Sequence, residues 1–158
     1  MELYLNQYEA SRIEINSKNM PKIVKVNFFK VTISNPVSSK GINTSDIKLV
    51  IISELKITSN SENFTIISGN EALFRFSNID LVIIDTIEIS NCQLLNNIFE
   101  FHNIKQLIIK NIYIEKVQFG QVFDIKNKKF YKNFSLFTIK DSTDITITNI
   151  NILNSLTN

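Results

Sequence analysis

Acidic side chains are the first residues to consider for chemistry, because common reactions on polysaccharides depend on them. Glycoside hydrolysis needs two carboxylates that face each other across a cleft. A calcium-dependent lyase needs an acidic cluster with a base beside it. Asp141 and Asp144 are close in the sequence, and only Arg12 and Arg75 could serve as an arginine base.

The chain contains repeated segments, which are described below. When these segments are aligned, the positions that hold an acid in one copy mostly hold other residue types in the other copies. Asp80 shares its position with Lys105 and Thr143, and Asp85 shares its position with basic and hydroxyl residues. Such positions do not bring several carboxylates to one point. We therefore predict no catalytic residue, and the chain is not expected to be an enzyme.

Three other features could bind ligands or react, and each has a simpler reading. His102 is the only histidine and aligns with Ser77 and Lys140, so we expect an exposed polar side chain rather than a metal ligand. Cys92 is the only cysteine, which excludes an internal disulfide and a CxxC motif. The segment 126–134, KNKKFYKNF, could contact an anionic glycan or nucleic acid, but we expect a solvated loop. No metal, cofactor or nucleic acid is predicted.

The composition fits one folded domain without a strong electrostatic field. The chain has 158 residues, of which 44% are hydrophobic, and a formal net charge of +2. This near balance gives no argument for an anionic membrane or nucleic acid as partner. No apolar run approaches the ~20 residues that span a bilayer, and the start, MELYLNQYEASRIE, lacks the apolar core of a signal peptide. We expect no membrane span within this chain.

A repeated pattern sets the elements that carry these side chains. It reads aliphatic-x-aliphatic, two turn-like residues, aliphatic-x-aliphatic, and period two on each side of a break predicts two short strands at an angle. In the three clearest copies we expect these aliphatic residues to form the core: Val82, Ile84, Ile87, Ile89, Leu107, Ile109, Ile112, Ile114, Ile145, Ile147, Ile150 and Ile152. Two weaker copies begin at Val26 and Val50.

A third strand precedes the other two in each clear copy. It is seen in the segments 73–78, 98–103 and 136–141, which place Phe74, Phe99 and Phe137 on the inner side. The segment 122–127 fits the same template, which leaves open whether 128–135 is a degenerate coil or an excursion loop. We read 35–45 as a loop and 64–67 as an extra strand.

Polar positions also recur in the aligned copies, at the ends of the predicted strands. One column holds Asp46, Asn78, Asn103 and Asp141, and a second holds Asn35, Asn91 and Asn154. Asn and Asp tolerate the left-handed conformation and bond to neighbouring backbone groups. We therefore expect side-chain ladders at corners between strands, with a structural role.

Three short strands in a repeat of about 25 residues cannot enclose a core alone, but stacked copies can pair strand on strand. The sequence predicts an all-β, parallel β-helix solenoid with about 25 residues per coil and five to six coils. Residues 1–22 are expected to be irregular strands or a partial coil. Residues 23–158 are expected to be a β-helix segment of a longer solenoid.

The three clear copies carry a family resemblance. FRFSNIDLVIIDTIEISN, FEFHNIKQLIIKNIYIEK and FTIKDSTDITITNINILN resemble the right-handed parallel β-helix of the pectin lyase-like superfamily, in particular the long Asn/Ile-rich β-helical surface proteins of single-celled eukaryotes. The resemblance covers residues 23–158. In those long proteins it implies a non-catalytic stalk that is extracellular or membrane-anchored. The catalytic features of the enzymes in the superfamily, a paired aspartate, Gly-His-Gly and Arg-x-Lys, are absent from this sequence.

Two alternatives remain open. Members of the pectin lyase-like superfamily are often carbohydrate-active, so the chain could be a fragment of such an enzyme. A leucine-rich-repeat binding module has a similar period, and its LxxLxL pattern overlaps residues 104–114. Against it, the Asn column of that family is occupied here by Ile87, Ile112 and Ile150.

The expected function is that of a non-catalytic structural or adhesive module of a cell-surface or secreted protein, with a surface glycan or protein and the remainder of a longer chain as partners. Ile51, Ile83 and Ile108 would form an outward apolar stripe for a covering loop, a partner or another copy. Three Asn-x-Ser/Thr motifs in predicted loops are candidate glycosylation sites, although chance explains their number. These sites are Asn43, Asn63 and Asn133.

Overall fold

The computed structural model describes residues 3–6, 13–16, 18, 25–34, 37–39, 42–58, 65–69, 72–94, 97–119, 123–124, 129–130 and 135–157. In these residues all regular elements are strands and no helix occurs, which confirms the predicted all-β class. Isoleucine, valine and phenylalanine favour this outcome because they fit a pleated surface. The strands are β1 (Leu3–Asn6), β2 (Ile13–Asn16), β3 (Lys25–Ser34), β4 (Val37–Ser39), β5 (Ile42–Thr58), β6 (Thr65–Gly69), β7 (Phe74–Leu94), β8 (Phe99–Ile109), β9 (Ile112–Phe119), β10 (Phe123–Asp124), β11 (Lys129–Phe130), β12 (Phe137–Lys140), β13 (Ile145–Ile147), β14 (Ile150–Leu153) and β15 (Leu156–Thr157).

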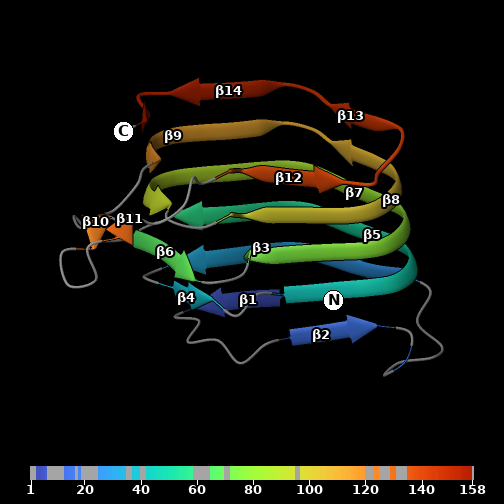
Figure 1. Ribbon diagram of the computed structural model, residues 1–158. Coiled ribbons are helices and arrows are strands. Elements are labelled where there is room, and N and C mark those ends of the chain that lie inside the picture. Colours follow the sequence, from blue (N-terminus) through green and yellow to red (C-terminus); the bar gives the residue numbers. More distant parts are fainter. Residues whose placement is uncertain are drawn as a thin grey trace.

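The described strands build one parallel sheet from stretches of chain that lie on one another. Thirteen strands belong to this sheet, whereas β10 and β11 form a separate antiparallel pair. β3 pairs with β5, β5 with β7, β7 with β8 and β9, and these with β12, β13 and β14. Figure 1 shows the stretches as bands, one above another, that bend round together at the same side. We call each stretch a layer, and β12, β13 and β14 together the last layer.

The layers pair in a register that aligns equivalent residues of the repeat. Val82 lies opposite Leu107, and Leu107 lies opposite Ile145. In the next row, Ile112 lies between Ile87 and Ile150. Because side chains alternate between the two faces of a strand, one aligned pair directs the whole row of apolar residues to the same face.

The core is a set of such rows. In the layers that have a neighbour on each side, the predicted core residues are at most 2% exposed. These are Val82, Ile84, Ile87, Ile89, Leu107, Ile109, Ile112 and Ile114. The phenylalanines of the third strand also stack, with ring centroids 5.2 Å apart for Phe74 and Phe99 and 5.6 Å apart for Phe99 and Phe137. Such offset ring pairs add stability beyond the burial of their area.

The last layer departs from the predicted core. Ile145, Ile150 and Ile152 are 43%, 56% and 54% exposed, and Ile147 is only partly buried. Each of these side chains lies over the equivalent residue of the layer below, but no described strand pairs with the other edge of the last layer. The exposure of these inward-facing residues follows from the missing cover on that side.

The corners have the conformation that the polar columns predict. Asp46, Asn78, Asn103 and Asp141 have φ values of 57°, 54°, 53° and 49°, in the left-handed region. Asn91 and Asn154 of the second column also have positive φ, whereas Asn35 lies outside the described residues. A single left-handed residue turns the strand, and pairing continues on both sides of it in β5 and β7.

Several boundaries differ from the prediction. The segment read as a loop over 35–45 contains β4 and the first residues of β5, so that Asn43 lies in a strand and not in a loop. The other two candidate glycosylation sites, Asn63 and Asn133, lie outside the described residues. The extra strand expected at 64–67 is found as β6. At the N-terminal side, β1 pairs with β3 and β2 with β5, in parallel, so this part shares the same sheet.

Thr44 is a buried polar residue in a row of aromatic side chains. Its neighbour in the row is Phe76, its side chain is fully buried, and its hydroxyl has no hydrogen-bond partner in the described part of the chain. Burying an unpaired hydroxyl is unfavourable. We expect Thr44→Val to raise the free energy of unfolding by roughly 1 kcal/mol, because valine has nearly the same shape and no hydroxyl. Urea denaturation measures this, and the exposed Thr146→Val should change little. Destabilisation by Thr44→Val would show that the hydroxyl is paired.

Candidate functional site

The polar corner columns form hydrogen-bonded ladders between layers. In the first column, Nδ2 of Asn78 donates to Oδ1 of Asp46 at 2.9 Å, and Nδ2 of Asn103 donates to Oδ1 of Asn78 at 2.9 Å. At another corner, Nδ2 of Asn149 donates to Oδ1 of Asn111, its aligned residue, at 3.0 Å, and Nδ2 of Asn111 donates to Oδ1 of Asp85, one position before the aligned residue of the preceding layer, at 3.4 Å. Both ladders tie three layers together.

Both ladders have the same direction, which explains their composition. Every side-chain amide donates toward the preceding layer, so the first member of each ladder only needs to accept. An ionised Asp is an acceptor without a donor, and Asp46 and Asp85 hold these first positions. These two acids are therefore used as ends of structural ladders.

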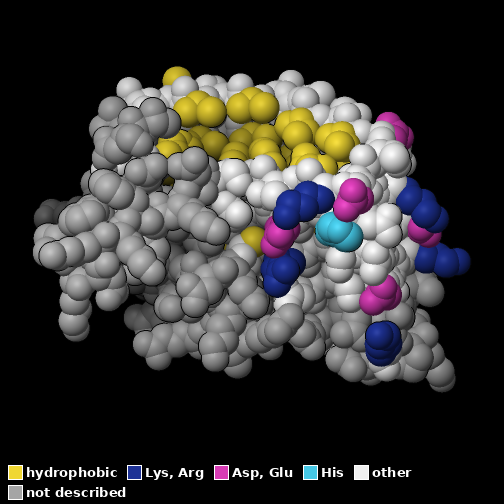
Figure 2. All heavy atoms as spheres, in the orientation of Figure 1, with side chains coloured by type: hydrophobic (Ala, Val, Ile, Leu, Met, Phe, Trp, Pro, Cys, Tyr) yellow, Lys and Arg dark blue, Asp and Glu magenta, His cyan; other side chains and the backbone are white. Residues whose placement is uncertain are grey.

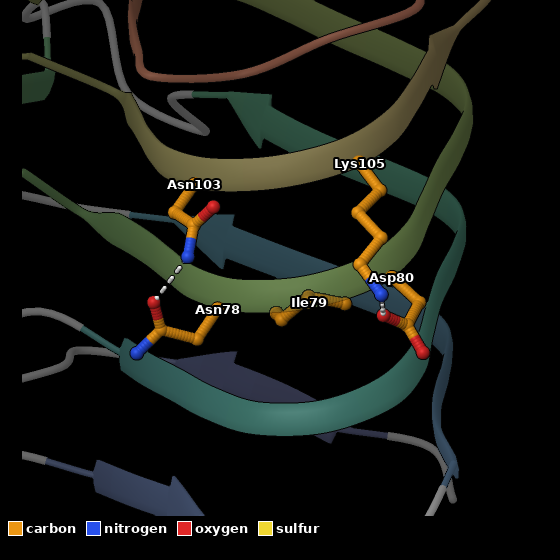
Figure 3. A pocket seen from close by; sticks show the side chains of 5 residues that line it. All are labelled: Asn78, Ile79, Asp80, Asn103 and Lys105. Carbon is orange, nitrogen blue, oxygen red and sulfur yellow. Dashed lines mark hydrogen bonds and ion pairs between the residues drawn. The ribbon is translucent and has the colours of Figure 1, made fainter.

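Beside the first ladder lies a hollow of about 170 Å³, which is open to solvent. Figure 3 shows Asn78 and Asn103 at one end of it, Asp80 and Lys105 at the other, and Ile79 between them. The amides bond to each other, and Nζ of Lys105 lies 2.6 Å from Oδ1 of Asp80. The polar groups around the hollow thus satisfy one another across two layers.

Outward-facing charges also pair between adjacent layers. Arg75 contacts Glu100 at 3.0 Å, and Lys56 contacts Glu88 at 3.1 Å. A third such pair, Lys30 with Glu54, has an N to O distance of 3.6 Å. In all three pairs the two residues are register partners in neighbouring layers. Exposed pairs of this kind contribute roughly 0.2–1 kcal/mol each, and they oppose a shift in register, which would separate the charges.

The acids singled out from the sequence do not converge in the described residues. Asp80 pairs with Lys105, Asp85 accepts from Asn111, and a carboxylate oxygen of Asp141 lies 3.0 Å from Nε2 of His102. His102 is exposed, as the alignment predicts, and it has an acidic partner that we did not predict. The alignment places His102 opposite Lys140, the residue that precedes Asp141, so the closeness of His102 and Asp141 could have been inferred from it.

The remaining candidates lie apart from these ladders. Cys92 is fully buried, and burial raises the pKa of its thiol to about 12, so the thiol stays neutral at physiological pH. Of the segment 126–134 the structure describes only β11, which pairs with β10 outside the main sheet. Arg12, a candidate base, lies outside the described residues.

The outward apolar stripe is present and only partly exposed. Ile51 pairs with Ile83, which pairs with Ile108, and all three have intermediate exposure. Neighbouring side chains in the stripe cover one another, as cross-strand neighbours do. Phe29 and Tyr113 are the more exposed aromatic residues of the described outer surface.

Within the described ranges, no group of three or more His, Cys, Asp and Glu side chains is arranged to hold a metal ion. None of the described residues belongs to a helix with the length and hydropathy that a membrane crossing requires.

The left-handed corner at Asn103 gives a test of the ladders. Replacement by Gly removes the ladder amide but keeps the backbone relaxed, whereas replacement by Ala also places a Cβ in the left-handed region. We expect Asn103→Ala to unfold more easily than Asn103→Gly by about 1 kcal/mol in urea. At Ser77, which has no positive φ, the order of the Ala and Gly variants should reverse. Equal stabilities at position 103 would contradict the corner assignment.

Comparison with known proteins adds no relative. No family model, curated protein or solved structure matches this chain.

Proposed function

We propose that the layers are coils of a parallel β-helix of the pectin lyase-like type and that the chain is a non-catalytic structural or adhesive module. The register carries this proposal, since equivalent residues recur in five successive layers in the row Val26, Val50, Val82, Leu107 and Ile145. A strand period that repeats in this way is typical of a solenoid. The coil geometry itself rests on the repeat in the sequence.

A structural role is supported by how the outer polar side chains are used. The Asn and Asp side chains of the corners bond along the stack, and the charges on the strands pair with their register partners. A catalytic or binding centre needs groups that are held toward a ligand. Here the corner amides, the carboxylates and the charged side chains bond to one another between layers, and these bonds stabilise the stack.

We place the module at the cell surface or in a secreted protein, in keeping with the resemblance to long Asn/Ile-rich surface proteins. A glycan or a protein on another surface is the partner expected of an adhesive module. The broad outer surface supports this, since it presents Phe29 and Tyr113 with 56% and 47% exposure among polar and charged side chains.

Localisation on intact cells tests the proposal. Antibodies raised against the folded chain should stain intact cells that produce the protein as strongly as permeabilised cells. Staining that requires permeabilisation would contradict a surface role.

The second candidate, a fragment of a carbohydrate-active enzyme, has a separate test. The purified chain is incubated with acidic and neutral polysaccharides, with and without calcium, and new reducing ends and unsaturated products are measured. We expect none. Cleavage that co-elutes with the folded chain in size-exclusion chromatography would replace the structural assignment, and cleavage that separates from the chain would be attributed to a contaminating enzyme.

A further inference from the structure

The middle strand of the repeat has an apolar outer surface. Five aliphatic side chains alternate there with the buried residues of the core, in three adjacent layers, and all five have intermediate exposure. They are Leu49 and Ile51 of β5, Leu81 and Ile83 of β7, and Ile108 of β8. We call these five residues the apolar face. A contiguous outward set of aliphatic side chains indicates a contact surface.

The outward rows of the other two strands carry charges that pair within the chain. Arg75 contacts Glu100 on the phenylalanine strand, and Lys56 contacts Glu88 on the last strand of the repeat. Figure 2 shows acidic, basic and histidine side chains next to one another on one face of the molecule. Such surfaces are well suited to water, whereas the apolar face has no charged member.

The two rows that contain the apolar face have polar residues on both sides of it. The first row has a basic residue in the layer of β3 and an acidic residue in the last layer, and both are exposed. The position of the acidic residue follows from Ile145, which comes directly after it and lies opposite Leu107. The first row is Lys25, Leu49, Leu81, Gln106 and Asp144, and the second row is Asn27, Ile51, Ile83, Ile108 and Thr146.

We propose that the apolar face is the contact surface for a second copy of this chain. The two copies are related by a two-fold axis that lies in the contact plane, parallel to the strands, at the level of β7. This axis reverses the order of the layers and keeps the position along the strand. Ile83 therefore meets Ile83 of the second copy, and Lys25 meets Asp144 of the second copy. Two sheets packed face to face with aligned strands form a stable core in β-sandwiches. The contact is isologous and stops at two copies.

The order of the charges selects this axis over the other one that the apolar face allows. A two-fold axis along the stack would also bring aliphatic side chains together. It would keep every layer at its own level, so that the lysines of the two copies lie at one end of the contact and the aspartates at the other. With the axis parallel to the strands, each Lys25 faces an Asp144, which is the complementary arrangement. The proposal goes beyond the proposed function and does not depend on the cellular location.

The size of the apolar face sets the strength that we expect. Adjacent layers lie ~4.8 Å apart, so the rows are about 20 Å long and only two outward residues wide. This is less than the roughly 800 Å² that each partner contributes to a standard interface. We therefore expect a weak dimer, with a dissociation constant on the order of 100 µM.

Sedimentation equilibrium at concentrations up to about 1 mM tests the dimer. The parent chain should pass from monomer to dimer and go no further. Ile83→Lys should remain a monomer, because the two new lysines would meet at the axis. The matched control is Tyr113→Lys, which adds the same charge on the outer surface of the last strand of the repeat, opposite Glu88, and it should dimerise like the parent.

A charge swap tests the axis at two exposed positions and keeps the test decisive if Ile83→Lys fails to fold. Lys25→Asp and Asp144→Lys should each raise the dissociation constant at least about threefold at low ionic strength. The double variant Lys25→Asp/Asp144→Lys should return it to within about twofold of the parent value. Lysine suits position 144, whose φ is 46°, because Lys116 has a φ of 53°.

Four results would each overturn the proposal. They are a parent chain that stays monomeric over the whole series, growth beyond two copies, a double variant that dimerises no better than the single variants, and loss of the dimer in Tyr113→Lys. The last of these would assign the contact to the strand that carries Tyr113.

Discussion

Replacement of Ile112 by Asp is expected to unfold the chain. Ile112 is fully buried, between Ile87 and Ile150 in its row, and only apolar side chains share this row. A carboxylate there loses its hydration without gaining a partner, or takes up a proton at a cost in free energy. We expect a loss of about 4 kcal/mol or more, which is a large part of the stability of a typical domain. Circular dichroism and urea denaturation measure it.

The same substitution one layer further along provides the control. Ile150 is the register partner of Ile112 and has the same residue type and strand position, but it is 56% exposed. We expect Ile150→Asp to cost less than about 1 kcal/mol, because the carboxylate can remain hydrated. If the two variants unfolded alike, position in the row and not burial would decide stability, and the core assignment would be wrong.

The row structure could be predicted because it depends on local spacing. The repeat aligns Val82 with Leu107 and Leu107 with Ile145, and the structure pairs these same residues. Spacing tells which way a side chain points, since alternate residues of a strand face opposite sides. The left-handed corners at Asn78 and Asn103 could be predicted for a similar reason, because few residues other than Asn, Asp and Gly adopt that conformation readily.

The exposure of the last layer could not be predicted from spacing. Ile145 and Ile150 have the same pattern around them as the buried Leu107 and Ile112. Direction within a layer is a local property, whereas burial depends on whether another layer covers the residue. The prediction of a loop over 35–45 was wrong for a related reason. The polar residues of this segment indicate a loop, but pairing with the first residues of β7 places Asn43 in a strand.

The outer surface was predicted only in part, although the necessary signal was in the alignment. The position shared by Asp80 and Lys105 was interpreted as dilution of the acids. Opposite charges at aligned positions of stacked strands are also what an ion pair between layers requires, and the structure has that pair. Opposite charges at one aligned position of a parallel repeat therefore indicate an ion pair between neighbouring layers. They should be interpreted in this way before they are used as evidence against a catalytic site.

Phe99→Ala is expected to have the second largest effect on stability. The Phe99 side chain is fully buried, and its ring lies 5.2 Å from Phe74, 5.8 Å from Phe101 and 5.6 Å from Phe137. Truncation removes all three ring contacts and leaves a cavity inside rows that are fixed by strand pairing and cannot collapse freely. We expect a loss of about 3–5 kcal/mol in the free energy of unfolding.

Two comparison variants separate the ring contacts from general hydrophobicity. Phe99→Leu keeps an apolar side chain in the cavity and should lose clearly less than Phe99→Ala, because the truncation penalty grows with the cavity. Phe29→Ala removes an equal amount of apolar side chain from a position that is 56% exposed, and it should cost less than about 1 kcal/mol. Urea denaturation of the three variants gives the order. A loss at Phe29 as large as the loss at Phe99 would mean that the outer surface, and not the phenylalanine stack, holds the layers together.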